Sequence, residues 1–246
     1  MRIDSVLLSV QGQKRVGVRY APDQEGKKRP GLLMLHGFPG AEKNVDVARA
    51  LVRRGWVCLA PHFRGSWGSH GQYSFSGILQ DTAYFWRILN RDPQVKRRST
   101  AVLGFSMGGW AALNFAAQGG RSAKAVVALA PMAGSRQWFG SRSRKKVWDL
   151  ARTLDIRSKD ALWRDFKRTL AVHDPMNVVG KIAAPLLIAH GTQDELVPYE
   201  LGRGLFVRAG SPKRFVTVRG ADHQFSEHRE KLIQSVVSFL TETIKS

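Results

Sequence analysis

Two kinds of apolar pattern alternate along the chain. Residues 3–10 and 14–20 alternate apolar with polar positions, which predicts an antiparallel pair of strands at the start. Short, nearly continuous apolar runs follow, and each predicts a strand that is covered on both faces. These runs occupy residues 32–35, 56–59, 101–103, 125–129, 185–189 and 215–218.

Longer amphipathic segments lie between these runs and can supply the covering helices. They occupy residues 42–54, 77–90, 107–118, 199–209 and 227–245. Strands that alternate with helices are typical of a doubly wound, mostly parallel sheet of the α/β class. In such sheets the chemistry gathers in the loops beyond the carboxyl ends of the strands, so the candidate residues are sought there.

The composition is that of one globular unit. The chain has 246 residues, 43% of them apolar, which is enough to bury a large core. No internal repeat or linker-like stretch divides it, so we expect a single domain over residues 1–246. The start of the chain lacks the pattern of a secretory leader and no apolar run has the length of a membrane span, so we expect a cytoplasmic protein. The single cysteine, Cys58, stands in an apolar run and is expected to be a buried strand residue.

Residues 104–110 read GFSMGGW and stand where a predicted strand gives way to a predicted helix. A serine between glycines at such a place is typical of a tight strand–turn–helix, with Ser106 at the apex in strained backbone geometry. Gly104 and Gly108 fit because strand and helix cross closely beside the serine. The motif also occurs by chance, so the assignment of Ser106 as a nucleophile depends on the partners that it needs.

A serine hydroxyl needs a base, for which histidine is the expected residue. Of the seven histidines we expect His223, because it stands in the loop between the last apolar run and the C-terminal amphipathic segment. His36 and His190 also end predicted strands. Each of them precedes a glycine and is interpreted as a loop-stabilising residue.

The base in turn needs an acid that orients it. Asp194 follows the predicted strand at residues 185–189 and precedes His223, giving the chain order Ser, Asp, His in which this chemistry is known to occur. Asp222 is adjacent to His223, but successive side chains on an extended backbone diverge. Glu195 is the alternative acid if Asp194 is instead a turn residue that binds its own backbone.

The tetrahedral intermediate of acyl transfer needs two hydrogen-bond donors for its oxyanion. One is expected to be the backbone N–H of Met107, directly after the nucleophile, and the other a backbone N–H from the loop at residues 36–40. In that loop Phe38 is the candidate, because Pro39 has no N–H.

Together these segments resemble the α/β-hydrolase family over essentially the whole chain. The resembling pieces are HGFPG at 36–40, FRGSWGS at 63–69, GFSMGG at 104–109, HGTQDELVP at 190–198 and GADHQF at 220–225. Within the family the chain is most similar to small serine esterases of the cinnamoyl or feruloyl type and to the hydrolase domain of prolyl-oligopeptidase-type peptidases. The resemblance implies an eight-stranded sheet, a Ser106–His223–Asp194 triad, and hydrolysis of an ester, thioester or amide with no cofactor and no metal. His62 departs from the family, in which many relatives have an acidic residue or asparagine, so the bonding of its loop is expected to differ.

Residues 133–175 interrupt the sheet pattern and contain two helix-like stretches, at 145–154 and 159–170. They are interpreted as a short helical cap over the substrate pocket. The pocket is expected to be mostly apolar, which favours an ester of medium-chain or aromatic acyl type. Its expected lining is Phe38, Trp67, Met132, Trp138 and Val197.

The formal net charge of +20 is extreme for a small hydrolase, and such a field attracts polyanions. A second class of function therefore stays open, that of a nucleic-acid or anionic-surface binding protein on a hydrolase scaffold. The basic residues are spread along the whole chain, however, and no helix-turn-helix, RNP-type or zinc-finger pattern occurs. We expect a small-molecule ester as the partner, neutral or anionic, with no specific nucleic acid and no membrane. The sequence leaves the oligomeric state open.

Overall fold

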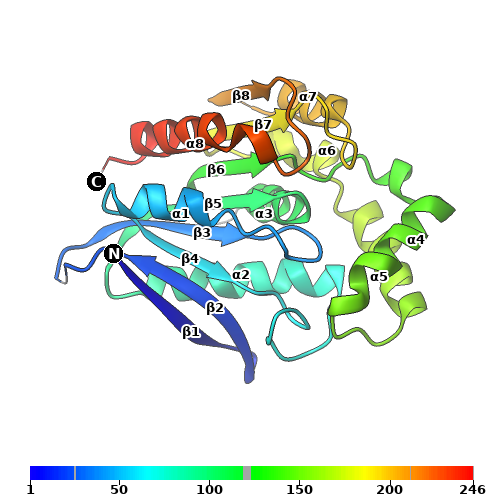
Figure 1. The fold of residues 1–246 in the computed structure, drawn as a ribbon, viewed down its shortest axis with the longest axis horizontal. Coiled ribbons are helices and arrows are strands. Elements are labelled where there is room, and N and C mark those ends of the chain that lie inside the picture. Colours follow the sequence, from blue (N-terminus) through cyan, green and yellow to red (C-terminus); the bar gives the residue numbers. More distant parts are fainter. Residues whose placement is uncertain (25, 119–122, 211, 246) are drawn as a thin grey trace.

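In the computed structural model, strands from the whole length of the chain join one sheet of eight strands (Figure 1). The structure describes residues 1–24, 26–118, 123–210 and 212–245. Each apolar run that predicted a strand overlaps a strand of the sheet. The strands are β1 (Arg2–Val10), β2 (Gln13–Ala21), β3 (Arg29–Leu35), β4 (Val57–Pro61), β5 (Val95–Phe105), β6 (Ala123–Leu129), β7 (Leu186–Gly191) and β8 (Lys213–Val218).

The strands follow the order β1-β2-β4-β3-β5-β6-β7-β8. The β1–β2 and β2–β4 pairs are antiparallel, and the pairs from β4 to β8 are parallel. At the centre, Leu33 of β3 lies opposite Leu59 of β4 and Val102 of β5, and all three side chains are buried. The predicted mostly parallel eight-stranded sheet is therefore confirmed.

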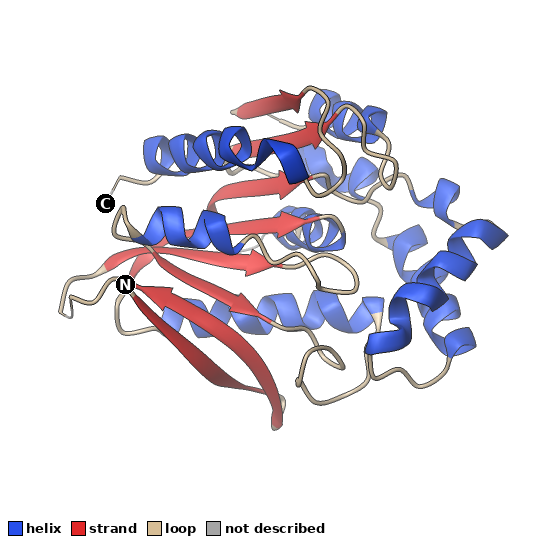
Figure 2. Cartoon of the chain, in the orientation of Figure 1, coloured by secondary structure: helices blue, strands red, loops and turns tan. Residues whose placement is uncertain are grey.

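Helices cover both faces of the sheet (Figure 2). The α-helices are α1 (Val45–Val52), α2 (Phe75–Arg91), α3 (Met107–Ala117), α4 (Ser141–Leu150), α5 (Lys159–Val172), α6 (Pro175–Val178), α7 (Tyr199–Arg208) and α8 (Arg229–Thr243), and the 3₁₀ helices are η1 (Ser135–Trp138), η2 (Ala151–Thr153), η3 (Val179–Lys181) and η4 (Ser226–His228). α1 and α8 pack on one face, around a core that includes Trp56 and Val236, while α2, α3 and α7 pack on the other, around Phe85 and Trp110. Within the described residues, no helix combines the length and the apolarity needed to cross a membrane.

The helices α4 and α5 lie beyond the carboxyl ends of the parallel strands (Figure 1). α4 begins at Ser141, earlier than the predicted residue 145, and α5 follows a serine cap in which Ser158 accepts a hydrogen bond from the N–H of Ala161. α5 is tied to the main body because Asp165 accepts hydrogen bonds from the N–H groups of Phe75 and Ser76, at 2.6 and 3.2 Å. A carboxylate at the N-terminus of α2 also matches the positive end of that helix dipole.

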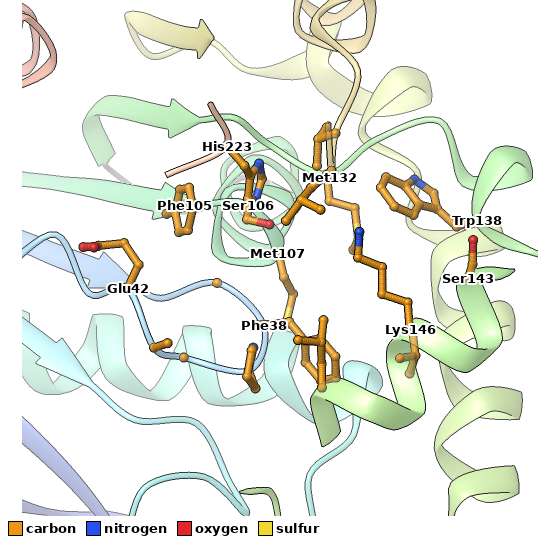
Figure 3. A pocket seen from close by; sticks show the side chains of 18 of the residues that line it. Phe38, Glu42, Phe105, Ser106, Met107, Met132, Trp138, Ser143, Lys146 and His223 are labelled. Carbon is orange, nitrogen blue, oxygen red and sulfur yellow. The ribbon is translucent and has the colours of Figure 1, made fainter. Parts of the chain in front are cut away.

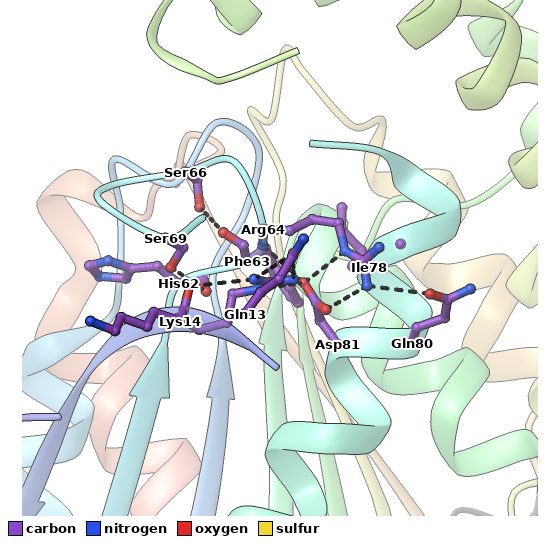
Figure 4. A network of polar contacts seen from close by, with 12 residues as sticks. Gln13, Lys14, His62, Phe63, Arg64, Ser66, Ser69, Ile78, Gln80 and Asp81 are labelled. Atoms are coloured by element: carbon purple, nitrogen blue, oxygen red, sulfur yellow. Dashed lines mark hydrogen bonds and ion pairs between the residues drawn. The ribbon is translucent and has the colours of Figure 1, made fainter. Parts of the chain in front are cut away.

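A buried ion cluster fixes the loop that follows β4 (Figure 4). Asp81, on α2, is fully buried and accepts hydrogen bonds from Arg64 through its backbone N–H at 2.9 Å and its Nη2 at 2.7 Å. The Nε atom of Arg15, on β2, lies 3.6 Å from the same carboxylate, and its side chain is 1% exposed. Burial lowers the pKa of Arg15, although Asp81 opposes that shift. Two cations therefore depend on one carboxylate for compensation inside the protein.

His62, which departs from the family pattern, forms a hydrogen bond within this loop. Its Nδ1 atom lies 3.1 Å from the carbonyl oxygen of Trp67, so the ring donates there. The hydroxyl of Ser69 donates to the carbonyl of His62 at 3.0 Å. The neighbouring Cys58 is buried in β4 as predicted, and burial raises the pKa of its thiol.

Candidate active site

Ser106 stands between the end of β5 and the start of α3. Its backbone has φ 54° and ψ −116°, in a region that non-glycine residues rarely adopt. Three backbone hydrogen bonds hold it there: its N–H donates to Leu129 at 2.8 Å, and its carbonyl accepts from Trp110 and Met132 at 3.0 Å each. The predicted strained turn is present, and the surrounding backbone determines it.

The glycines beside Ser106 let the strand and the helix approach each other. A Cβ atom on Gly104 would lie 2.0 Å from the carbonyl oxygen of Gly108, and one on Gly108 would lie 2.1 Å from the carbonyl oxygen of Leu35. Atoms cannot come this close, so neither position can hold a side chain without moving backbone.

His223 comes from the loop between β8 and α8 and lies beside Ser106 (Figure 3). Its Nδ1 atom is 2.7 Å from Oδ2 of Asp194, and its ring packs on Phe105 with centroids 5.0 Å apart. Because a carboxylate can only accept, Nδ1 carries the hydrogen and Nε2 is left as the acceptor. This is the tautomer that a base for Ser106 requires.

Asp194 receives donors on both of its oxygens. Oδ1 accepts from the N–H groups of Leu196 and Val197, and Oδ2 accepts from His223 and lies 3.2 Å from Nε2 of His190. Burial by itself raises the pKa of Asp194, but the hydrogen bonds from His190, His223 and Val197 outweigh it and hold the pKa well below its usual value. Asp194 is therefore a charged acceptor at neutral pH.

The two other acids that stand close to His223 or Asp194 in the sequence do not contact His223. Asp222 is exposed, and its carboxylate accepts hydrogen bonds from the N–H and the hydroxyl of Ser226. Glu195 is exposed as well. The structure brings Asp194 to His223, as the sequence predicted, and it adds His190, which sequence reasoning treated only as a loop residue.

The loop at residues 36–40 runs beside the serine. A Cβ atom on Gly37 would lie 3.2 Å from the Cβ atom of Ser106, so the backbone that leads to Phe38 passes close to the nucleophile. Met107 is the first residue of α3, and the first N–H groups of a helix have no partner within the helix. This arrangement leaves the backbone N–H groups of Phe38 and Met107 as the candidate donors for an oxyanion.

Ser106 and His223 line a pocket of about 470 Å³ (Figure 3). Four residues predicted for the pocket from the sequence are among its lining, namely Phe38, Met132, Trp138 and Val197. The sequence did not single out Phe75 and Phe166, which also line it. Phe166 stood in the helix-like stretch at 159–170, and Phe75 stood just before the amphipathic segment at 77–90. The lining is mostly apolar, as expected for an acyl or aryl group.

Trp67 is not among the lining residues, so its expected place in the pocket was wrong. Its indole N–H donates to the carbonyl of Pro39 at 2.9 Å, the ammonium of Lys43 lies 4.7 Å from its ring centroid, and the residue is 42% exposed. The indole therefore braces the outside of the loop at residues 36–40.

Helix α4 supplies further lining residues that sequence reasoning missed. Ser143, Lys146, Val147 and Leu150 all line the pocket. They are spaced at three, four and seven residues, which places them on one face of a helix. The sequence shows this spacing, but it does not show that this face of α4 points into the pocket.

The prolyl oligopeptidase family model matches residues 44–246 of this chain. The chain is 27% identical over 242 residues to the uncharacterized protein Rv2307c of Mycobacterium tuberculosis, covering 97% of this chain and 79% of that protein. It is 26% identical over 203 residues to the uncharacterized peptidase YtmA of Bacillus subtilis, covering 80% of this chain and 75% of that protein.

Among solved structures, the chain is similar to Est1E from Butyrivibrio proteoclasticus. The TM-score is 0.82 at 23% identity, over 98% of this chain and 99% of Est1E. This likeness, with the sheet order and the turn at Ser106, confirms the predicted α/β-hydrolase fold. Since the family model covers most of the chain, the chain belongs to the prolyl oligopeptidase family and is a hydrolase of the esterase or peptidase type.

Proposed function

We propose that the chain is a serine hydrolase that cleaves carboxylic esters of medium-chain or aromatic acyl type. The observation that carries this proposal is the 2.7 Å hydrogen bond from His223 to Asp194, beside a serine held in a strained turn at the wall of an apolar pocket. A base in the correct tautomer, next to a hydroxyl at the surface of a cavity, is what nucleophilic acyl transfer requires.

In this mechanism His223 Nε2 takes the proton of Ser106 as the serine oxygen attacks the ester carbonyl. The N–H groups of Phe38 and Met107 donate to the oxygen that becomes negative. The protonated His223 then gives its proton to the departing alkoxide, which leaves as the alcohol, while the acyl group stays bonded to Ser106 as an acyl-enzyme. A water molecule, deprotonated by His223, attacks this acyl group and regenerates Ser106. Asp194 stabilises the imidazolium form of His223 throughout.

The size and the lining of the pocket support an acyl group of medium length or an aromatic ring. Phe38, Phe75 and Phe166 offer apolar faces, and a pocket of about 470 Å³ fits a small organic acid rather than a polymer. The similar structure Est1E has been solved with ferulic acid bound, an aromatic acid. That observation belongs to Est1E and supports only the chemical class proposed for this chain.

Replacement of Ser106 by alanine tests the proposal. Because the alanine has no nucleophile, hydrolysis of para-nitrophenyl esters of increasing chain length and of methyl ferulate should fall by about 10³-fold or more while the far-UV circular dichroism stays the same. A fluorophosphonate should label the wild-type protein at Ser106, as read by peptide mass spectrometry. Undiminished turnover by the purified Ser106→Ala protein would refute the assignment.

A second candidate is hydrolysis of small amides, peptides or thioesters through the same residues. The match to the prolyl oligopeptidase family and the similarity to the uncharacterized peptidase YtmA favour it. All of these reactions pass through a tetrahedral intermediate at the same serine, so the site alone does not choose among them. An aminoacyl anilide and an acyl thioester, assayed beside the esters, decide by their relative kcat/KM.

The net charge of +20 keeps a binding function on a hydrolase scaffold as the alternative from another class. Binding of nucleic acid would show as an affinity for DNA that falls with salt and survives the Ser106→Ala change. We expect only weak binding at low salt. A tight complex at physiological salt would make hydrolysis the secondary property.

A further inference from the structure

One lysine side chain projects into the mostly apolar pocket. Lys146 lines the cavity from α4, and its side chain reaches from that helix toward the middle of the pocket (Figure 3). It shares the pocket-facing side of α4 with Ser143, Val147 and Leu150. Its neighbour Lys145 is exposed as Lys146 is, but it is not among the lining residues, so Lys146 faces the pocket and Lys145 does not.

Lys146 has no carboxylate partner among the described residues of the protein. Glu42, which also lines the pocket, comes from the loop after β3, and its carboxylate accepts a hydrogen bond from the N–H of Asn44. On α4 itself, Asp149 pairs with Arg152 at 2.8 Å. The ammonium group of Lys146 is thus available to a ligand.

The surroundings favour an anion as that ligand. Apolar side chains such as Phe38, Met132 and Trp138 line the same space, and a charge pair is stronger where water is partly excluded. Lysine offers one compact charge, whereas phosphate groups are commonly bound by several donors or by the two-pronged guanidinium of arginine. A single ammonium group suits a single carboxylate.

We propose that Lys146 is a specificity-determining residue that pairs with a free carboxylate on the substrate, so that the preferred esters carry a second, unesterified carboxyl group. This inference rests on the proposed ester hydrolysis at Ser106 and narrows its substrate class. The apolar lining contacts the hydrocarbon part of such a substrate, and the ammonium group contacts its far end. Because residue 146 keeps contact with solvent, water screens the pair and limits the preference to an intermediate size.

The test compares esters that differ only in charge. Monomethyl esters of dicarboxylic acids of increasing length, and para-acetoxybenzoate, are each assayed beside the neutral compound in which an amide replaces the free carboxylate. The proteins are the wild type, Lys146→Met, which removes the charge and keeps a similar chain length, and Lys146→Arg, which keeps the charge. Lys145→Met is the matched control, because it removes the same charge from the adjacent exposed residue, which does not line the pocket.

We expect the wild type to prefer the carboxylate ester of at least one pair. Lys146→Met should lower kcat/KM for that ester by about tenfold, the size of a charge-assisted hydrogen bond, and change it less than about twofold for the amide partner. Lys146→Arg should retain most of the preference, and Lys145→Met should retain all of it.

Three results would overturn the inference. The first is hydrolysis of the ester bond in the neutral, amide-bearing compounds at rates equal to or above those of every carboxylate-bearing ester. This result would leave the proposed function standing. The second is an equal loss of preference in Lys146→Met and Lys145→Met, which assigns the effect to the general positive field of the protein. The third is an absence of hydrolysis of every ester together with no fluorophosphonate labelling of Ser106, which refutes the proposed function itself.

Discussion

The Nε2 atom of His190 lies 3.2 Å from the Oδ2 atom of Asp194, where both side chains are buried. The same nitrogen lies 2.9 Å from the carbonyl oxygen of Val197, which can only accept, so Nε2 carries the hydrogen. The buried imidazole of His190 therefore donates toward the carboxylate that orients His223. His190 is a positioning residue in the proposed mechanism, since it does not line the pocket.

Replacement of His190 by phenylalanine should lower kcat by about tenfold, because Asp194 loses one charge-assisted donor and its carboxylate is held less firmly. KM for a neutral ester should stay nearly constant, because the pocket lining is unchanged. Steady-state kinetics measure both values, and thermal denaturation checks that the variant is folded. An increase in KM with an unchanged kcat would contradict the positioning role.

Replacement of Asp194 by asparagine should cost far more activity than the same change at Asp222. The asparagine cannot hold His223 in the required tautomer, and a loss of about 10⁴-fold in kcat is expected. Asp222 is the matched control, because it is adjacent to His223 in the sequence but its carboxylate accepts hydrogen bonds from Ser226. Equal losses in the two variants would require a different acid.

Acid should destabilise the protein through His36. This side chain is buried, its Nδ1 lies 2.7 Å from the carbonyl of Gly37, and its Nε2 accepts from the N–H of Phe63. Burial lowers its pKa from 6.5 to about 3. The unfolded chain therefore binds the extra proton between about pH 6.5 and pH 3, so the stability is full above pH 6.5 and falls as the pH decreases through that range.

The contribution of His36 to this fall is at most about 1.4 kcal/mol per pH unit. Urea denaturation of the wild type and of a His36→Gln variant at a series of pH values measures it. The slope of the free energy of unfolding against pH should be smaller for His36→Gln. The difference should correspond to the uptake of up to one proton on unfolding. Parallel curves for the two proteins would assign the acid sensitivity to other groups.

Replacement of Asp81 by asparagine should lower the free energy of unfolding by about 3–5 kcal/mol, because Arg15 and Arg64 lose the charge that compensates them inside the protein. Asp149→Asn is the matched control. It breaks an exposed pair with Arg152, and such pairs are worth less than about 1 kcal/mol. Chemical denaturation measures the free energy of unfolding of the two variants. Similar losses would mean that the buried ion pairs of Asp81 stabilise the protein no more than an exposed pair does.

The sequence by itself determined the sheet and the strained turn at Ser106. Apolar runs that are continuous over several residues require cover on both faces, so they predicted the central strands wherever the chain returned to the sheet. The glycines around Ser106 predicted the tight turn, because a residue without a Cβ lets neighbouring backbone approach closely. Each of the three residues Ser106, Asp194 and His223 follows a predicted strand. Parallel strands bring their carboxyl ends to one edge of the sheet, so the three residues were expected to lie near one another.

Only the tertiary structure decided which side chains face the pocket. Trp67 and Lys146 show this, since the aromatic residue expected in the pocket is not among its lining residues, and a lysine that the sequence did not single out reaches into it. Their orientation depends on the angle at which a loop or a helix packs on the sheet, and that angle is set by contacts between residues far apart in the sequence, such as the hydrogen bonds from Phe75 and Ser76 to Asp165. The contact of His190 with Asp194 was undetermined for the same reason, because periodicity shows that a residue is buried but not which buried atom it meets.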